Sequence, residues 1–294
     1  MHYTLRQIEV FLATAHFENV TQAANSLAMS QSAASSALQD LEQRFDIQLF
    51  DRAGKRVQLS ELGKALRPRA EALLAQAREF EHSLTQRTDV AELKVGATLT
   101  IGNYLAVPIM AEFMNLHPDA RVSLTVENTA AIASRVRNFE LDIGLIEGEL
   151  QDPVLEVIPW REDELALFCA PGHPLANQRT LSDADLLAAR WVVREAGSGT
   201  RQAFDRAMHG LLPDLDLRLN LQHTEAIKRA VEAGLGIGCL SAIALRDAFA
   251  RGSLIRLEAP QRDWTRKFYF ILHRQKYRSA GIQSWLTLCQ AQER

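Results

Sequence analysis

The chain has few cysteines and no long apolar run. Its three cysteines, Cys169, Cys239 and Cys289, lie far apart in the 294 residues and show no CxxC or Cys/His ligand spacing. Metal and disulfide roles are therefore not expected, and Cys169 in "LALFCA" and Cys239 in "GIGCL" are predicted to be buried small hydrophobes. No apolar stretch reaches the roughly 18 residues of a membrane helix, and Arg6 and Glu9 interrupt the first apolar segment. We expect a cytoplasmic protein without membrane span or secretory signal.

Common enzyme motifs are also missing. The "GSG" at 197–199 is not a GxSxG nucleophile elbow, no GxxxxGKS/T phosphate loop occurs, and the eight histidines form no HExxH pair. The "GLGIG" at 234–238 follows a predicted helix instead of opening one, so its glycines indicate a helix end and a tight entry into a strand. We expect no catalytic residue, no metal and no cofactor.

Charge is absent from 19–39, where helices are nevertheless predicted. Apolar side chains at three-and-four spacing predict a first helix over 4–17. Thr21 is placed to cap a second helix that runs through Leu27, and Ser30 to cap a third from about Gln31 to Arg44. The short connection between the second and third helices is typical of a helix-turn-helix.

The third helix has one apolar face and one short, uncharged polar face. Its inner face carries Ala34, Ala37, Leu38 and Leu41, and its outer face carries Gln31, Ser32, Ser35 and Gln39. A helix in the DNA major groove brings its backbone close to base edges, where short donors and acceptors fit. The alternative is a small-residue helix inside a bundle, but its polar side chains would then be buried without obvious partners. We therefore favour insertion into DNA.

A basic stretch follows the third helix. The segment "FDRAGKRVQLSELG" predicts a hairpin that turns at Gly54, the wing of a winged helix-turn-helix. Between Arg52 and Arg69, six basic residues, among them Lys55 and Arg56, face only one acidic residue, Glu61. This local excess suits contact with DNA phosphates, although a solvated charged turn is the alternative.

A long amphipathic helix is predicted next. Its apolar stripe comprises Leu62, Leu66, Ala70, Leu73, Ala77, Phe80 and Leu84, and it contains Pro68. A narrow stripe of this length indicates pairing with an identical chain, unless the helix lies on its own domain. The segment "QRTDVAEL" loses the period and is interpreted as a hinge.

The remaining 200 or so residues alternate strands and helices, from "LKVGA" to "KFYFIL". This order predicts an α/β fold with mostly parallel strands and helices on both faces, arranged as two lobes with a cleft between them.

Three stretches place hydroxyls and backbone amides after a strand, at the start of a helix: "ATLTIGN" at 97–103, "GSGTRQ" at 197–202 and "HTEAIK" at 223–228. Helix N-termini attract anions, and ligands of open α/β sheets bind beyond the carboxyl ends of the strands. Each turn alone can be an ordinary cap, but together they predict a cleft for a small anion. The residues expected to line it are Thr98, Leu99, Thr100, Asn103, Thr129, Glu147, Arg194, Ser198, Thr200, Arg201, His223 and Thr224.

Glu147 is the unusual member of this set. Arginine pairs readily with a carboxylate or sulfur oxyanion, whereas Glu147 disfavours a strongly anionic ligand unless it is screened, protonated or bridged by water.

The segment "LRQIEVFLATAHFENVTQAANSLAMSQSAASSALQDLEQRFDIQLFDRAGKRVQLSELGKAL" resembles the N-terminal domain of LysR-type transcriptional regulators. The later motifs "GATLTIGNYLAVPIM", "DIGLIEG", "REAGSGTR" and "EAIKRAVEAGLGIGCLS" resemble that family's effector domain, so the similarity covers nearly the whole chain. It points to the branch containing CysL and YeiE, which is associated with sulfur oxyanions.

This resemblance implies a periplasmic-binding-protein-like effector domain and a homotetramer, a dimer of dimers, on a promoter palindrome of double-stranded DNA. RNA polymerase is a further expected partner. Gln31, Ser32 and Ser35 would read bases, with Gln39 on the same face, while Arg52 and Lys55 or Arg56 would hold the backbone or the minor groove at the wing. Ser36 replaces an arginine frequent in the family.

The expected domains are a winged helix-turn-helix at 1–60, a linker helix and hinge at 61–88, and an effector domain at 89–294. Lobe I spans about 89–162 and 267–294, and lobe II about 163–266. The predicted function is transcription regulation controlled by a small anion such as sulfite. The alternative is a solute-binding protein or metabolic enzyme with an N-terminal oligomerisation bundle.

Overall fold

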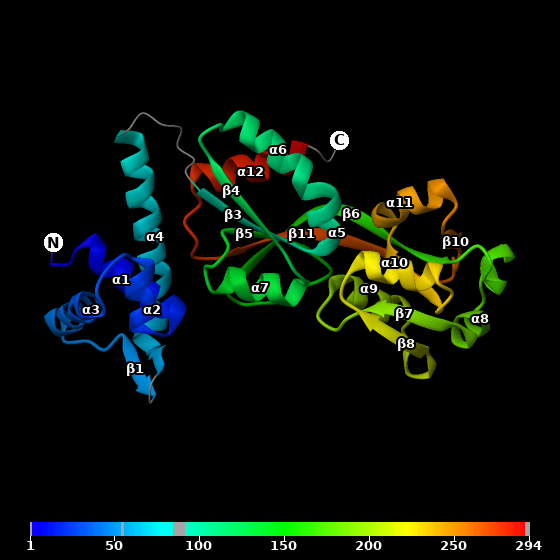
Figure 1. Ribbon diagram of the computed structural model, residues 1–294, viewed down its shortest axis with the longest axis horizontal. Coiled ribbons are helices and arrows are strands. Elements are labelled where there is room, and N and C mark those ends of the chain that lie inside the picture. Colours follow the sequence, from blue (N-terminus) through cyan, green and yellow to red (C-terminus); the bar gives the residue numbers. More distant parts are fainter. Residues whose placement is uncertain (1, 54–55, 85–91, 292–294) are drawn as a thin grey trace. The chain divides into compact units, whose positions relative to one another are not determined.

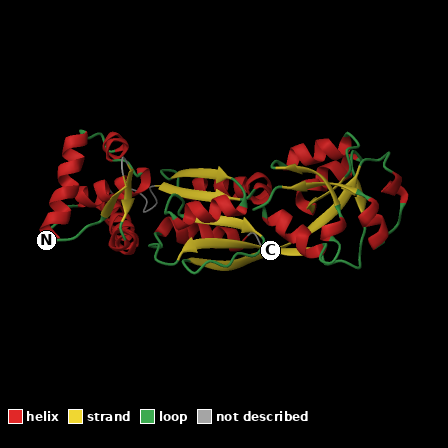
Figure 2. Cartoon of the chain, turned by 90° about the horizontal axis from the view of Figure 1, so that it is seen from below, coloured by secondary structure: helices red, strands yellow, loops and turns green. Residues whose placement is uncertain are grey.

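The computed structural model describes residues 2–53, 56–84 and 92–291. It divides into two compact units, Met1–Ala91 with Arg274–Gln283, and Glu92–His273 with Ser284–Arg294. The first unit is mostly helical and the second mixes strands and helices (Figures 1 and 2). Within the described ranges, no helix is both long and apolar enough to cross a membrane.

The first unit is a three-helix bundle with a hairpin and a long helix. In chain order it contains α1 (Leu5–Phe17), α2 (Val20–Ser26), α3 (Gln31–Phe45), β1 (Phe50–Ala53), β2 (Arg56–Leu59) and α4 (Glu61–Leu84). The strands β1 and β2 pair antiparallel, as the wing prediction requires. The predicted turn at Gly54 and the predicted hinge at 85–91 lie outside the described residues.

Side-chain caps fix the ends of these helices. Ser30 caps α3 as predicted, because its hydroxyl accepts the N–H of Ala33 at 3.2 Å. The prediction for α2 was wrong, since Asn19 is the cap and accepts the N–H groups of Thr21 and Gln22. Asn19 has the extended conformation that precedes a helix, whereas Thr21 already lies in the first turn.

Small side chains let the helices of the first unit approach closely. Ala24 and Ala34 are fully buried together with Val10 and Phe11, and the Phe11 ring meets Phe50 edge-to-face at 5.6 Å. Helix α4 joins this core through Ala70 and Leu74. The Glu79 side chain of α4 accepts the hydroxyl of Tyr277, which ties residues 274–283 to the first unit.

The apolar stripe of α4 is only partly covered. Ala70 is buried, whereas Phe80 is 65% exposed and Leu84 68% exposed. Pro68 lies within the helix without ending it. The exposed end of the stripe is available for the predicted pairing with a second chain.

The second unit is built on strands in the order β4-β3-β5-β11-β6-β9-β7-β8, with β10 beside β6. The strands are β3 (Glu92–Ala97), β4 (Arg121–Val126), β5 (Ile143–Glu147), β6 (Leu155–Cys169), β7 (Arg190–Arg194), β8 (Asp216–Leu221), β9 (Ile237–Ser241), β10 (Ile255–Leu257) and β11 (Thr265–His273). The helices are α5 (Leu99–Ile101), η1 (Gly102–Ala106), α6 (Val107–Leu116), α7 (Thr129–Arg137), η2 (Pro174–Asn177), α8 (Asp183–Ala188), α9 (Gly199–Ala207), η3 (Leu212–Asp214), α10 (Thr224–Glu232), α11 (Ala242–Arg251) and α12 (Ala280–Ala291).

Two long antiparallel strands join the lobes of this unit. β6 pairs with β11 as far as Glu164 and with β9 from Leu165 onward, so one strand belongs to both lobes. Lobe I contains the parallel strands β4, β3 and β5, and lobe II contains β8, β7 and β9 (Figure 1). The predicted two-lobed α/β fold is confirmed.

The cysteines lie in the cores of this unit. Cys169 and Cys289 are fully buried and Cys239 is 2% exposed, as predicted for Cys169 and Cys239. Burial raises the pKa of the Cys169 thiol to about 11 and raises that of Cys239 further.

The start of α4 leaves no room for a side chain at Gly63. The Gly63 N–H donates to the Ser60 hydroxyl, and a Cβ at Gly63 would lie 2.2 Å from the carbonyl oxygen of Leu49. The Gly63→Ala variant should therefore lose about 1–3 kcal/mol of unfolding free energy through overpacking, measured by thermal unfolding followed by circular dichroism.

Gly172→Ala is the control, because no atom lies within 4 Å of its added Cβ. It should change stability by less than about 0.5 kcal/mol. Equal losses in the two variants would contradict the close approach of α4 to Leu49.

Candidate functional site

Helix α3 presents its predicted polar face to the surface. Gln31, Ser32 and Gln39 are exposed and Ser35 is half-buried. On the opposite face Ala34 is 0%, Leu38 7% and Leu41 6% exposed. These polar side chains are therefore not buried inside the helical bundle. Their short length and lack of charge match the requirements of a helix in the major groove.

The predicted wing contacts are only partly described. Arg52 lies in β1 opposite Val57, and Arg56 in β2 opposite Ala53. The side chains of Arg52 and Arg56, and all of Lys55, lie outside the described residues.

The residues predicted to line the cleft include a buried carboxylate. Glu147 ends β5 and is 1% exposed. Its Oε1 accepts the Thr98 hydroxyl at 2.9 Å and the Thr100 backbone N–H at 2.8 Å. Its Oε2 accepts the Thr200 hydroxyl at 2.8 Å and Arg266 Nη1 at 2.8 Å. We call this set of four donors the carboxylate cradle.

Arg266 extends the cradle across the strands that join the lobes. Its Nε donates to Asp163 at 2.6 Å, and the other oxygen of Asp163 accepts the Ser241 hydroxyl at 2.8 Å. Arg266 lies in β11, Asp163 in β6 and Ser241 at the end of β9. The network therefore links lobe I, through Glu147, with lobe II, through Thr200 and Ser241.

The cradle keeps Glu147 ionised. Burial alone raises the pKa of the carboxyl, but the positive charge of Arg266 and the hydrogen bonds from Thr100, Thr200 and Thr98 outweigh it and hold the pKa at about 2. The same carboxylates raise the pKa of Arg266 against the opposing effect of its burial. At neutral pH the cradle therefore holds an internal anion.

A second set of contacts fixes the backbone beside the cradle. The Thr129 hydroxyl donates to the Glu147 carbonyl oxygen at 3.0 Å and accepts the Gly199 N–H at 3.2 Å. A Cβ at Gly199 would lie 1.9 Å from that carbonyl oxygen, so only glycine allows this approach. The start of α9 is thus held against the end of β5.

The two predicted arginines pair with protein carboxylates. Arg194 is 2% exposed and bonds both oxygens of Glu195, at 2.8 and 2.9 Å. Arg201 pairs with Asp205 at 2.7 Å. Neither guanidinium contacts the cradle through the bonds described, although both were predicted to face an anion.

The other predicted residues divide between buried and cavity positions. Ser198 and Thr224 are buried, and the Thr224 hydroxyl has no partner among the described atoms. Leu99, Asn103 and His223 line a cavity of about 440 Å³ that also includes Glu127 and Glu195. The structure brings Thr98, Thr100, Glu147 and Thr200 together and places Asn103 and His223 at this neighbouring cavity.

Sequence reasoning missed Arg266, Asp163 and Ser241. The predicted strand "KFYFIL" begins at Lys267 and so excludes Arg266. Asp163 lies in the charged stretch "REDE", a composition typical of exposed segments. One signal was available: in "RKFYF" the period of two places Arg266 on the same face as Phe268 and Phe270, which are fully buried.

Arg266 should contribute strongly to the unfolding free energy of the second unit. Arg266→Met leaves the carboxylates of Glu147 and Asp163 buried without their cation and should lower the unfolding free energy by about 3–5 kcal/mol in denaturant titrations. Arg256→Met is the matched control, because Arg256 also contacts two carboxylates but is 38% exposed. It should cost about 0–1 kcal/mol. A small loss in Arg266→Met would show that the buried charges do not depend on this side chain.

Two family models match the chain. Residues 5–64 match the bacterial regulatory helix-turn-helix protein, lysR family, and residues 86–294 match the LysR substrate binding domain. Together the two matches cover most of the chain, and residues 65–85, which include most of α4, lie between them.

Individual relatives agree with the models. The chain is 41% identical over 289 residues to the uncharacterized HTH-type transcriptional regulator YeiE of Escherichia coli K12, covering 98% of each. It is 33% identical over 253 residues to the HTH-type transcriptional regulator CysL of Bacillus subtilis, covering 84% of this chain and 82% of CysL. The CcmR regulatory domain of Synechocystis PCC6803, solved in complex with 2-PG, superposes with a TM-score of 0.64 at 29% identity, covering 69% of this chain and 98% of that one. The chain belongs to the LysR family of bacterial transcriptional regulators, with a DNA-binding helix-turn-helix and an effector-binding domain, and is not an enzyme.

Proposed function

We propose that this regulator senses a small oxyanion, sulfite or a related species, at the carboxylate cradle, and that α3 reads the bases of its promoter. The observation that carries the proposal is the convergence of four donors from both lobes and β11 on one carboxylate. Hydrogen-bond donors that hold a carboxylate also suit other small oxyanions. The sequence resemblance to the branch containing CysL and YeiE favours a sulfur oxyanion.

The effector would compete with Glu147 for these donors. An oxyanion next to an ionised Glu147 is repelled, so binding requires that the carboxylate leaves the cradle or takes up a proton. Because Thr98 and Thr100 belong to lobe I and Thr200 to lobe II, an anion that replaces Glu147 would change how the lobes are held together. In this proposal the internal carboxylate represents the state without effector.

The active species would be a homodimer or homotetramer in the cytoplasm. The exposed apolar end of α4 supports pairing with an identical chain. Two α3 helices would then bind the halves of a palindrome, with Arg52 and Lys55 or Arg56 on the backbone, and effector binding would alter their spacing. RNA polymerase would be contacted from the bound DNA.

DNA recognition is tested first. DNA sites are selected from a random pool by the wild-type protein, and affinities are measured by fluorescence anisotropy at several salt concentrations. Gln31→Ala should cost about 1–3 kcal/mol of discrimination between selected and scrambled sites, and Ser35→Arg should change the selected sequence. Affinity should fall steeply with salt.

Gln151→Ala is the control, because Gln151 is an exposed glutamine of the second unit. It should leave discrimination unchanged. If Gln31→Ala and Ser35→Arg also leave the selected sequence unchanged, α3 is not the reading helix.

The effector is tested by thermal unfolding of the full chain with sulfite, sulfate, phosphate and acetate. An anion at one hundred times its Kd should add about 2.7 kcal/mol of stability. Thr200→Val removes one hydroxyl donor and should weaken binding about fivefold, since such a bond contributes roughly 1 kcal/mol. Glu147→Ala removes the internal competitor and should strengthen it.

Thr180→Val is the control, because Thr180 is exposed and contributes nothing to the cradle. If no oxyanion stabilises the wild type, sulfite sensing is excluded while DNA recognition stands. If Glu147→Ala abolishes binding, the carboxylate is not a competitor.

A further inference from the structure

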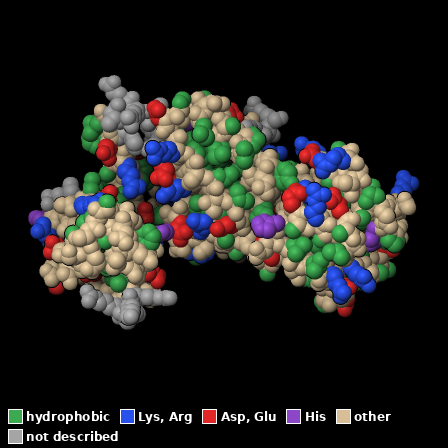
Figure 3. All heavy atoms as spheres, in the orientation of Figure 1, with side chains coloured by type: hydrophobic (Ala, Val, Ile, Leu, Met, Phe, Trp, Pro, Cys, Tyr) green, Lys and Arg blue, Asp and Glu red, His purple; other side chains and the backbone are tan. Residues whose placement is uncertain are grey.

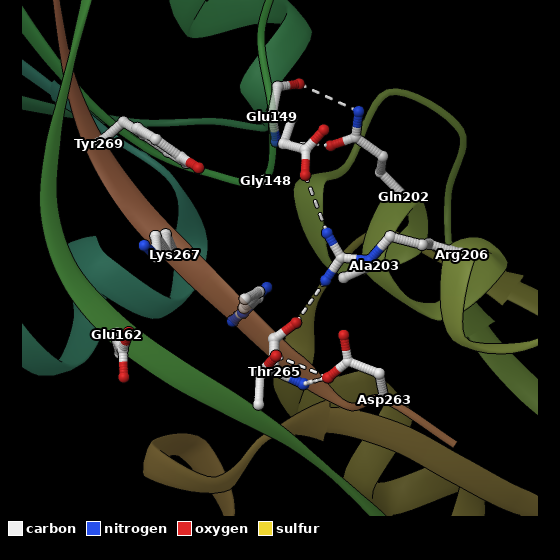
Figure 4. Close-up of a pocket in the computed structure, with 11 residues that line it drawn as sticks. Gly148, Glu149, Glu162, Gln202, Ala203, Arg206, Asp263, Thr265, Lys267 and Tyr269 are labelled. Carbon is white, nitrogen blue, oxygen red and sulfur yellow. Dashed lines mark hydrogen bonds and ion pairs between the residues drawn. The ribbon is translucent and has the colours of Figure 1, made fainter. Parts of the chain in front are cut away.

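The second unit contains another cavity, which shares only Arg266 with the carboxylate cradle. Its volume is about 540 Å³, and Figure 4 shows side chains from the end of β5, from α9 and from the strands β6 and β11 around it. Thr265, Lys267 and Tyr269 alternate along β11 with the buried Arg266 and Phe268. Because side chains of a strand alternate between its faces, Thr265, Lys267 and Tyr269 project from the face of β11 opposite Arg266 and Phe268.

In one wall of the cavity, the polar side chains form hydrogen bonds and an ion pair with other groups of the protein. Arg206 pairs with Glu149 at 3.0 Å and also donates to the Thr265 carbonyl oxygen. The Gln202 side chain exchanges two hydrogen bonds with the backbone of Glu149, at 2.9 and 3.0 Å. Asp263 accepts the N–H and the hydroxyl of Thr265. This wall joins the end of β5 in lobe I to α9 in lobe II.

The opposite wall carries exposed charges that have no protein partner among the described residues. Lys267 and Glu162 stand directly opposite each other in the register of β11 and β6, and both line the cavity. Such a cross-strand pair of opposite charges normally associates. Among the described residues, however, no hydrogen bond or ion pair involves the side chain of Lys267, Glu162 or Tyr269, and Figure 4 draws all three without a dashed line.

Arg266 also lines this cavity, although its side chain projects from the other face of β11. Its Nη2 is buried with no partner among the described atoms. The Nε and Nη1 atoms of the same guanidinium are held by Asp163 and Glu147. A cation that is already fixed by two carboxylates thus has the two N–H groups of its Nη2 left without an acceptor among the described atoms.

The balance of charge indicates what kind of ligand fits. The lining includes three acidic side chains, Glu149, Glu162 and Asp263, and three basic ones, Arg206, Arg266 and Lys267. A simple anion would meet the carboxylates and a simple cation the basic groups, so each would be repelled in part. A molecule that carries both charges close together can satisfy both unpaired side chains at once.

We infer that this cavity binds a small zwitterion of the α-amino-acid class. The ligand ammonium pairs with Glu162, and its carboxylate pairs with Lys267 and accepts the Tyr269 hydroxyl. Because lobe I and lobe II both contribute to the cavity, the ligand binds one arrangement of the lobes better than another, and so acts as a second effector. This site does not depend on the identity of the anion at the carboxylate cradle.

The test uses the full chain and the twenty L-amino acids, screened by thermal unfolding and followed by calorimetric titration. At least one amino acid should stabilise the protein and bind. Its N-acetyl derivative, which lacks the ammonium, and its amide, which lacks the carboxylate, should each bind at least tenfold more weakly. Lys267→Met and Glu162→Gln should each weaken binding at least tenfold.

Two further variants separate loss of the proposed contacts from unspecific effects of substitution. Glu164→Gln is the control, because Glu164 lies on the same strand but pairs with Arg256 outside the cavity, and it should change affinity less than twofold. Lys267→Arg keeps the positive charge and should retain binding that Lys267→Met loses. If no amino acid binds, or if the N-acetyl derivative binds as well as its parent, the inference is overturned. Neither result bears on the response to sulfite.

Discussion

The second unit depends on keeping one charge, the carboxylate of Glu147, away from water. An ionised carboxylate that is 1% exposed is tolerated only when cations and donors surround it. These partners come from the segment after β3, from α9 and from β11. The buried Arg266 cation pairs in turn with the Asp163 carboxylate, which accepts the Ser241 hydroxyl. The network of compensating contacts therefore includes residues of both lobes. The position of the lobes is therefore tied to the solvation of a single side chain.

In the proposed function, the Glu147 carboxylate occupies the position that the effector oxyanion would take. Hydroxyl and amide donors do not distinguish strongly between a side-chain carboxylate and a free oxyanion of similar size, so selectivity must come from charge and shape. The face of the second unit seen in Figure 3 carries basic and acidic side chains intermingled, without a broad patch of one sign. An anion that binds as proposed would therefore be held by the local donors near Glu147 more than by a long-range field.

The sequence predicted the secondary-structure elements better than the side-chain contacts between them. Local signals located α3, because Ser30 caps it and the alternation of faces follows the helical period. They also located the strand end at Glu147 and the hydroxyls of Thr98 and Thr200. They did not show that Thr100 contributes its backbone N–H, that Arg194 is held by the adjacent Glu195, or that Arg266 and Asp163 meet 103 residues apart. Pairing over such separations depends on how strands associate, which no local pattern encodes.

The burial of the cysteines has a practical consequence. All three thiols are enclosed in packed cores, and at neutral pH the thiolate fraction of Cys169 is only about one in ten thousand, given its pKa of about 11. Maleimide reagents will therefore bypass the native sulfurs in the folded protein. A fluorophore or spin label attached to one new surface cysteine in each lobe would report lobe closure directly, without first removing Cys169, Cys239 or Cys289.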